Sequence, residues 1–121
     1  MVTGTLVAES LRAGAELDGI GLVTRKISRV AVREPAAGQP AAWTLIEFEA
    51  ADSDAGRLAT ALAAVLDEPG WYVDFRSPAE TFVVYSGRVF RYPRGDSAGR
   101  AEATAWGRAR GVPDRQLDWP A

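Results

Sequence analysis

The clearest pattern in the sequence is an alternation of apolar and polar residues between positions 71 and 92. A period of two indicates strands whose successive side chains point to opposite faces. The alternation predicts strands at residues 71–76, 81–85 and 88–92. A four-residue loop with Pro78 and a tight turn at Ser86 and Gly87 separate them, as in a three-stranded antiparallel meander.

Three further strands are predicted upstream of this meander. Residues 43–49 alternate in the same way and predict a strand with one apolar face. Residues 22–33 are rich in Val, Ile and Thr with basic residues between them, which is typical of a partly exposed edge strand. Residues 5–11 fit a strand or a short helix, and we favour a strand. Residues 34–42 contain two prolines and a glycine and predict a loop.

Two segments have helical patterns. Leu58, Leu62 and Leu66 recur at every fourth residue and predict a helix that packs on the sheet, capped by Asp52 or Ser53. A second helix is expected to begin at Asp96 or Ser97 and to run to residue 110, where a glycine follows. We expect the tail through Trp119 to fold back onto the domain.

These elements predict a single α+β domain spanning residues 1–121. The strand at 43–49, the helix and the strand at 71–76 form a crossover unit, which places the two strands parallel in one sheet. We expect a two-layer sandwich: a mixed, mostly antiparallel sheet of about five strands with two helices on one face.

Pairing Arg76 with Thr81 and Tyr85 with Arg88 assigns each side chain of the meander to a face. The face predicted to lie under the helices collects Trp71, Val73, Phe75, Phe82, Val84 and Val89, with Ile46 and Phe48. The opposite face, here called the aromatic face, collects Leu45, Glu47, Glu49, Tyr72, Asp74, Arg76, Thr81, Val83, Tyr85, Arg88, Phe90 and Tyr92. Because two short helices cannot cover both sides, this face is exposed, covered by the N-terminal segment or buried against another subunit.

Composition excludes several kinds of chemistry. The chain has no histidine and no cysteine, which removes the usual zinc ligands, thiolate nucleophiles, Ser-His-Asp triads and disulfides. We expect no cofactor and no metal. Lys26 is the only lysine among 14 basic residues, and the formal net charge is −2, which makes nucleic-acid binding an unfavoured function.

No apolar run reaches the roughly 18 residues of a membrane span, and the first ten residues lack a signal-peptide pattern. We therefore expect a cytoplasmic protein without a membrane partner. The bias toward Ala, Arg and Gly is typical of GC-rich genomes. Residues 70–75, 82–84, 89–92 and 111–119 resemble parts of small standalone bacterial proteins, and this resemblance implies a complete unit and no particular activity.

The aromatic face is the main candidate for function, because a contiguous apolar patch with aromatic and Arg residues is typical of an interaction site. It predicts a small soluble binding module that forms a homodimer or binds a protein partner. The expected interface residues are Leu45, Tyr72, Arg76, Val83, Tyr85, Arg88, Phe90 and Tyr92. The alternative is that these side chains only stack across the strands of a solvated sheet.

A different class of function uses the same face. Asp74 and Glu47, flanked by Tyr72, Tyr85 and Arg88, are the candidate catalytic residues of a cofactor-independent isomerase, cyclase or lyase. Burial between aromatic rings raises the pKa of a carboxylate toward the range of a general acid or base. An ion pair of Asp74 with Arg76 or Arg88 is the simpler interpretation and the favoured one.

Two other charged clusters have simple structural explanations. Glu47, Glu49, Asp52 and Asp54 are spread over a strand end and a helix start, where they complement the helix dipole rather than converge on a metal. Residues 94–100 could receive an anion at the start of the second helix, but capping by Asp96 explains them better.

Overall fold

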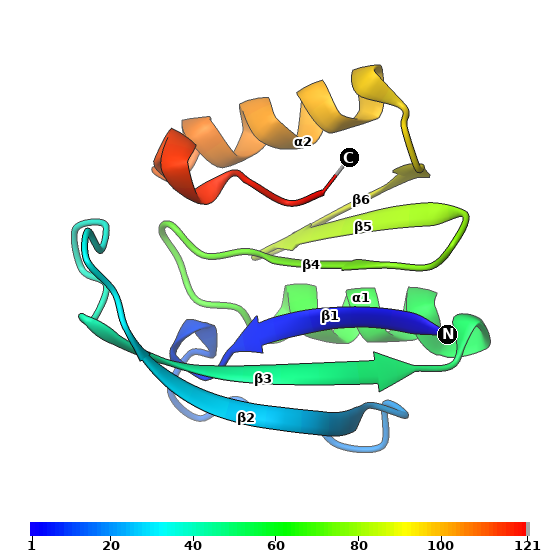
Figure 1. The fold of residues 1–121 in the computed structure, drawn as a ribbon, viewed down its shortest axis with the longest axis horizontal. Coiled ribbons are helices and arrows are strands. Elements are labelled where there is room, and N and C mark those ends of the chain that lie inside the picture. Colours follow the sequence, from blue (N-terminus) through cyan, green and yellow to red (C-terminus); the bar gives the residue numbers. More distant parts are fainter. Residues whose placement is uncertain (121) are drawn as a thin grey trace.

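The computed structural model describes residues 1–120, which form a six-stranded sheet and two α-helices (Figure 1). The strands are β1 (Val2–Val7), β2 (Val23–Ala31), β3 (Ala42–Ala50), β4 (Val73–Arg76), β5 (Glu80–Tyr85) and β6 (Arg88–Pro93). The helices are α1 (Ala55–Val65) and α2 (Ser97–Ala109), and the 3-10 turns are η1 (Ala8–Ser10), η2 (Asp52–Asp54) and η3 (Asp114–Gln116). The α+β class predicted from the sequence is confirmed, with one strand more than about five.

The strand order is β2-β3-β1-β4-β5-β6, and every neighbouring pair is antiparallel. β1 lies between β3 and β4, so β3 and β4 run parallel to each other without being paired. The predicted crossover through α1 is therefore correct in direction. The expectation of a mixed sheet is wrong, because the N-terminal strand enters the gap that would otherwise hold a parallel pair.

β1 can occupy this central place because it carries a glycine at its closest approach to its neighbours. Gly4 is paired with Phe48 on one side and Phe75 on the other. A Cβ at Gly4 would lie 2.6 Å from the Phe75 Cβ and 2.7 Å from the Asp74 carbonyl oxygen. No other residue type fits there without moving β4.

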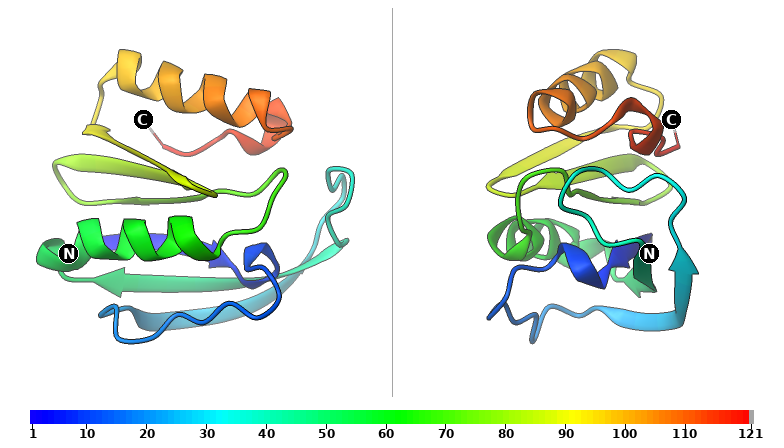
Figure 2. Two further views of the ribbon diagram at one scale, coloured as in Figure 1. Left: turned by 180° about the vertical axis from the view of Figure 1, so that it is seen from behind. Right: turned by 90° about the vertical axis from the view of Figure 1, so that its left-hand side faces the viewer.

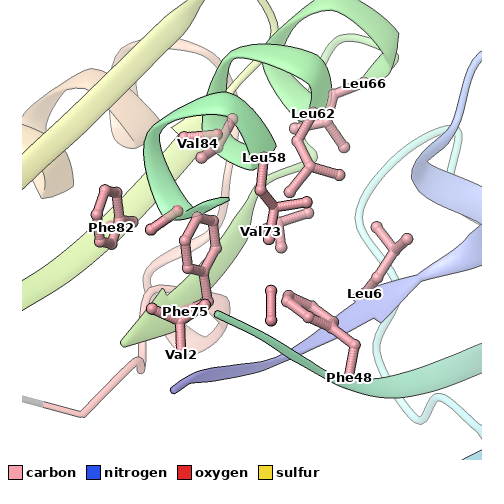
Figure 3. Packing of buried hydrophobic residues seen from close by; sticks show 13 residues of the cluster. Val2, Leu6, Phe48, Leu58, Leu62, Leu66, Val73, Phe75, Phe82 and Val84 are labelled. Carbon is pink, nitrogen blue, oxygen red and sulfur yellow. The ribbon is translucent and has the colours of Figure 1, made fainter. Parts of the chain in front are cut away.

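One core lies between α1 and the sheet (Figure 3). The predicted stripe of Leu58, Leu62 and Leu66 is fully buried, as expected. The sheet residues beneath and beside α1 are Val2, Leu6, Phe48, Val73, Phe75, Phe82 and Val84. The rings of Phe75 and Phe82 stack with centroids 4.7 Å apart. Trp71, predicted to belong to this core, is only half-buried and lies outside it.

A second core lies on the opposite face of the sheet, under α2 and the C-terminal segment of residues 112–120 (Figures 1 and 2). Seen from behind in Figure 2, α1 lies in front of the strands and the C-terminal segment lies beyond them. The core consists of Val83, Tyr85, Phe90, Tyr92, Ala103, Val112, Leu117 and Trp119. The prediction that both helices share one face is therefore wrong.

The strand pairing behind that prediction is nevertheless correct. Arg76 pairs with Thr81 and Tyr85 with Arg88, as the turn lengths require. The error lies in the placement of α2. Its small residues Gly99, Ala103 and Gly107 recur at every fourth position and form a flat stripe that fits over the tyrosines. A Cβ at Gly107 would lie 2.5 Å from the Tyr85 hydroxyl oxygen.

Candidate functional site

α2 divides the aromatic face into two halves. The covered half, on β5 and β6, contains Val83, Tyr85, Phe90 and Tyr92, each at most 7% exposed. These four residues were expected to form an interface, and the structure buries them within the chain instead. Their face is not helix-free, so that part of the prediction is wrong. The physical reason is that the tyrosine hydroxyls find partners in the covering segment.

Those partners are specific. The Tyr85 hydroxyl donates a hydrogen bond to the Ala103 carbonyl oxygen at 2.7 Å. The Trp119 indole N–H donates to the Tyr92 hydroxyl oxygen at 2.8 Å. Burial raises the pKa of both tyrosines above the usual value, so they remain neutral donors and acceptors. The hydroxyls serve packing rather than chemistry.

Within residues 1–120, no helix lies over the open half of the aromatic face, on β2, β3, β1 and β4 (Figure 1). A cavity of about 230 Å³ lies on it, between these strands and the C-terminal segment. Its lining residues are Thr5, Val7, Trp43, Gly70, Trp71, Tyr72, Asp74, Arg115, Gln116 and Asp118. A neighbouring depression shares Trp43, Arg115 and Gln116 and extends to residues 32–34. We call the cavity and this depression together the open groove.

Aromatic side chains form one wall of the cavity. The rings of Trp43 and Trp71 lie 5.3 Å apart at an angle of 56°, and both residues are half-buried. The Trp43 indole N–H donates to the Pro40 carbonyl oxygen at 3.0 Å, which fixes that ring. Tyr72 packs against Trp119 at 5.3 Å and joins the cavity to the second core. The wall is thus held in place from both sides.

The other wall is the C-terminal segment, which polar contacts hold against the loop of residues 34–39. The Arg115 guanidinium donates to the Glu34 carbonyl oxygen at 2.6 and 3.1 Å. The Gln116 amide donates to the Gln39 side chain at 3.0 Å, and Gln39 donates to the Gly70 carbonyl oxygen at 3.0 Å. The Tyr72 hydroxyl donates to the Gln116 carbonyl oxygen. These bonds give the groove a defined shape without a ligand.

Asp74 lies in the cavity and is paired with Arg76. The Arg76 Nη2 and Asp74 Oδ2 atoms are 2.6 Å apart, which confirms one of the two predicted ion pairs. Burial raises the pKa of Asp74; Arg76 opposes this shift, and the nearby Asp118 adds to it. Burial also raises the pKa of Tyr72 far above its usual value. Asp74 and Tyr72 both line the cavity; the sequence placed them on one face of the sheet and did not predict a cavity.

The other predicted catalytic residues are elsewhere. Glu47 is exposed, lies one strand away from β4 across β1, and faces Lys26 at 3.8 Å. Tyr85 is buried under α2 and does not line the cavity, although its ring lies 5.8 Å from the Tyr72 ring. Arg88 is exposed on β6, where its guanidinium lies over the Phe90 ring at 4.6 Å. The five residues of the acid–base hypothesis do not line one cavity, because β1 lies between Glu47 and β4, α2 covers Tyr85, and Arg88 is exposed on β6.

The predicted interface residues Leu45, Tyr72 and Arg76 lie on the open half and are half-buried. Sequence reasoning missed Trp43, Trp71, Gln116 and Asp118 as site residues. Trp71 was assigned to the core because it precedes a strand in phase with Val73. Trp43 alternates with Leu45 and could have been found by extending the aromatic face by one more residue.

The remaining clusters are structural. Glu49 pairs with Arg25 at 2.9 Å, and Asp54 pairs with Arg57 at 2.7 Å. Asp52 pairs with the N-terminal amine at 2.7 Å. Within residues 1–120, no group of three or more Asp or Glu residues could hold a metal ion. Asp96 caps α2 by accepting hydrogen bonds from the Ala98 and Gly99 amides, as predicted.

No family model, curated protein or solved structure matches this chain. In the part of the chain that the structure describes, no helix is both long and apolar enough to cross a membrane. The geometry of the open groove is therefore the basis for a functional proposal.

Proposed function

We propose that this chain is a small binding module that recognises a protein partner through the open groove. The proposal retains the interaction function expected from the sequence and moves it from the covered half to the open half of the aromatic face. A sheet surface without helix cover, with aromatic residues around a recess, is the kind of surface that protein partners bind.

One observation carries the proposal. Trp43 and Trp71 pack against each other at the surface, half-buried at the rim of a cavity. Tryptophan and tyrosine dominate the energetic centres of protein interfaces because each buries a large area at low entropic cost. The polar contacts of Arg115 and Gln116 keep this recess open, so little ordering would accompany binding.

The shape of the groove favours a different protein over a second copy of this chain. A twofold dimer places the same patch on both sides of the interface. In such a dimer the cavity of one copy faces the cavity of the other, which leaves a void unless another part of the patch projects into it. We therefore take the occupant to be a partner with a projecting side chain, and the homodimer expected from the sequence is the competing outcome. The proposal keeps the expected cytoplasmic location.

Site-specific photo-crosslinking tests the proposal. A photoreactive residue replaces Thr5, which is exposed at the cavity, and in a matched variant it replaces Thr60, which is exposed on α1. We expect a single protein adduct from position 5 that is absent from position 60 and is lost on Trp71→Ala. The purified adduct partner should bind the wild type at least about tenfold more tightly than Trp71→Ala, as for an interface anchor.

Two results would contradict the proposal. The first is the same set of adducts from both positions. The second is an adduct of the chain with itself, together with a dimer in sedimentation velocity that Trp71→Ala converts to a monomer. This second result would support the homodimer instead.

Acid–base catalysis is the second candidate, and the raised pKa of Asp74 in a cavity favours it. The pairing of Asp74 with Arg76 at 2.6 Å and the distance of Glu47 from the cavity weigh against it. If the chain is an enzyme, Asp74→Asn should abolish turnover of a substrate and leave the melting temperature nearly unchanged.

A further inference from the structure

The size of the cavity indicates what it can hold. Pockets for cofactors and other drug-sized ligands occupy roughly 300–1,000 Å³. The cavity bounded by Trp43, Trp71 and Asp74 measures about 230 Å³. By itself this cavity suits one long side chain better than a cofactor, and the neighbouring depression of about 540 Å³ is more open to solvent.

The charges around the cavity are not balanced. Asp74 is paired with Arg76 at 2.6 Å, and Arg115 is held by Glu34 through the carbonyl oxygen and, at 3.5 Å, the carboxylate. Asp118 is exposed, and within residues 1–120 it has no ion-pair partner. Its carboxylate accepts a long hydrogen bond from the Tyr72 hydroxyl at 3.5 Å. The cavity itself therefore has one negative charge in excess, while the exposed Arg33 lies in the neighbouring depression.

The aromatic rings show a second imbalance. The chain covers several of its rings with its own arginines, at 3.8 to 5.3 Å from guanidinium carbon to ring centroid. These pairs are Arg88 with Phe90 and Trp106, Arg91 with Phe82, Arg100 with Trp119, and Arg110 with Trp106. Among the described residues, no basic group lies over Trp43 or Trp71. The two tryptophans without a cation are the two that line the cavity.

We infer that the cavity receives one basic side chain of the partner, an arginine in preference to a lysine, which stacks against Trp43 or Trp71 and pairs with Asp118. This inference rests on the proposed function and names the chemistry that the partner must present. Cations are attracted to the faces of tryptophan rings, and a planar guanidinium also stacks on them. Arg115 also lines the cavity, but its Nε–H and Nη2–H groups donate to the Glu34 carbonyl oxygen.

NMR titration with short peptides tests the inference on the whole chain. The probes are acetylated and amidated Gly-Arg-Gly, Gly-Lys-Gly and Gly-citrulline-Gly, in which citrulline is the neutral analogue of arginine. The chain has four tryptophans, so the indole N–H signals of Trp43 and Trp71 report on the cavity, and that of Trp106, which does not line the cavity, serves as an internal control. We expect the arginine peptide to shift the first pair at low salt.

The peptide series and two charge variants distinguish cation recognition from non-specific binding. We expect the citrulline peptide to bind at least about fivefold more weakly than the arginine peptide, with lysine between them. The Asp118→Asn variant should bind the arginine peptide about fivefold more weakly than the wild type does. Glu102→Gln removes an exposed charge on α2 that has no ion-pair partner in the described residues. This variant should leave the affinity for the arginine peptide unchanged.

Equal binding of the citrulline and arginine peptides, equal effects of Asp118→Asn and Glu102→Gln, or no saturable shift of the Trp43 and Trp71 signals would overturn the inference. These failures differ from failure of the proposed function. If Trp71→Ala weakens binding of a protein partner and Asp118→Asn does not, the groove is an interface and the inference is wrong. If the arginine peptide binds but position-specific crosslinking finds no partner, the chemistry of the cavity stands and the proposed function fails.

Discussion

The aromatic face has a covered half, on β5 and β6, and an open half, on β2, β3, β1 and β4. The two halves resemble each other in sequence, since both mix large aromatic residues with charged ones. In the covered half, the Tyr85 and Tyr92 hydroxyls bond to α2 and to Trp119. In the open half, Trp43 and Trp71 contact each other at the rim of a cavity.

The difference arises from what lies over each half. α2 presents Gly99, Ala103 and Gly107 on one side, and this stripe lets backbone approach the rings of the covered half closely. Within residues 1–120, the open half is bordered at one edge by the extended C-terminal segment and the loop of residues 34–39, and no helix covers it. Similar sheet surfaces can therefore form a core or stay open, depending on the small residues of a helix elsewhere in the chain.

The largest expected effect compares one tryptophan from each half. Trp119→Ala removes a buried ring from the covered half and leaves the Tyr92 hydroxyl without its donor. We expect it to lower the free energy of unfolding by about 4 kcal/mol. Trp71→Ala, in the open half, should cost only about 1 kcal/mol because its ring is half-buried. Urea denaturation measures both, and equal losses would show that the two halves are equally part of the core.

The second effect concerns the small-residue stripe. Gly107→Val places new atoms against the Tyr85 hydroxyl and Leu117, which a Cβ alone would approach to 2.5 and 2.8 Å. We expect a loss of about 3 kcal/mol from overpacking, measured by urea denaturation. Gly56→Ala is the matched control on α1, since its Cβ would have no neighbour closer than 3.8 Å. It should be neutral or stabilise by up to about 1 kcal/mol. A mild effect of Gly107→Val would mean that α2 can shift without loss.

The sequence predicted most of the local structure. Alternation and turn length were sufficient for the register of β4, β5 and β6, and Gly87 adopts the positive φ that a two-residue turn favours. The stripe of three leucines was also sufficient to predict how α1 packs, because leucines at helical spacing lie together on the buried side. The Asp74–Arg76 pair followed from their shared face on β4.

The sequence did not predict the order of the strands or the side on which α2 lies. β1 pairs with β3 over residues far apart in the chain, and no local pattern distinguishes a central strand from an edge strand of that length. The centre of the α2 face that packs on the sheet consists of Gly and Ala, with Trp106 beside it, and Ala is frequent throughout this chain. The open groove depends on both features, so Trp43, Trp71 and Asp118 could not be brought together from sequence alone.

The third effect compares the tyrosine hydroxyls. Tyr85→Phe removes a donor from a buried hydrogen bond to the Ala103 carbonyl oxygen, and we expect a loss of about 1 kcal/mol. Tyr72→Phe removes the bond to the Gln116 carbonyl oxygen at the border of the open half, where water can replace the lost donor, and should cost about 0.5 kcal/mol. Thermal unfolding of the two variants orders them. The reverse order would indicate that the C-terminal segment, rather than α2, is the more strongly held cover.

The smallest effect is a dependence of stability on pH that has opposite signs at two carboxylates. Burial raises the pKa of Asp74 above 3.8 in the folded chain. The protonated Asp74 is thus favoured by folding, and the stability it contributes is lost as the pH rises through its folded pKa. The free energy of unfolding of Asp74→Asn should therefore increase relative to that of the wild type as the pH rises from 4 to 7, by less than about 1 kcal/mol.

Glu9 provides the opposite case. Burial alone would raise the pKa of Glu9, but hydrogen bonds from the backbone amides of Thr44 and Glu9 itself, together with Arg29, lower it below 4.5. The stability contributed by ionised Glu9 is present above the unfolded pKa and is lost as the pH falls. The free energy of unfolding of Glu9→Gln should therefore decrease relative to that of the wild type as the pH rises from 4 to 7. Urea denaturation at several pH values measures both slopes. Slopes of the same sign would show that Arg76 outweighs burial at Asp74, so that the cavity is less desolvated than its lining indicates.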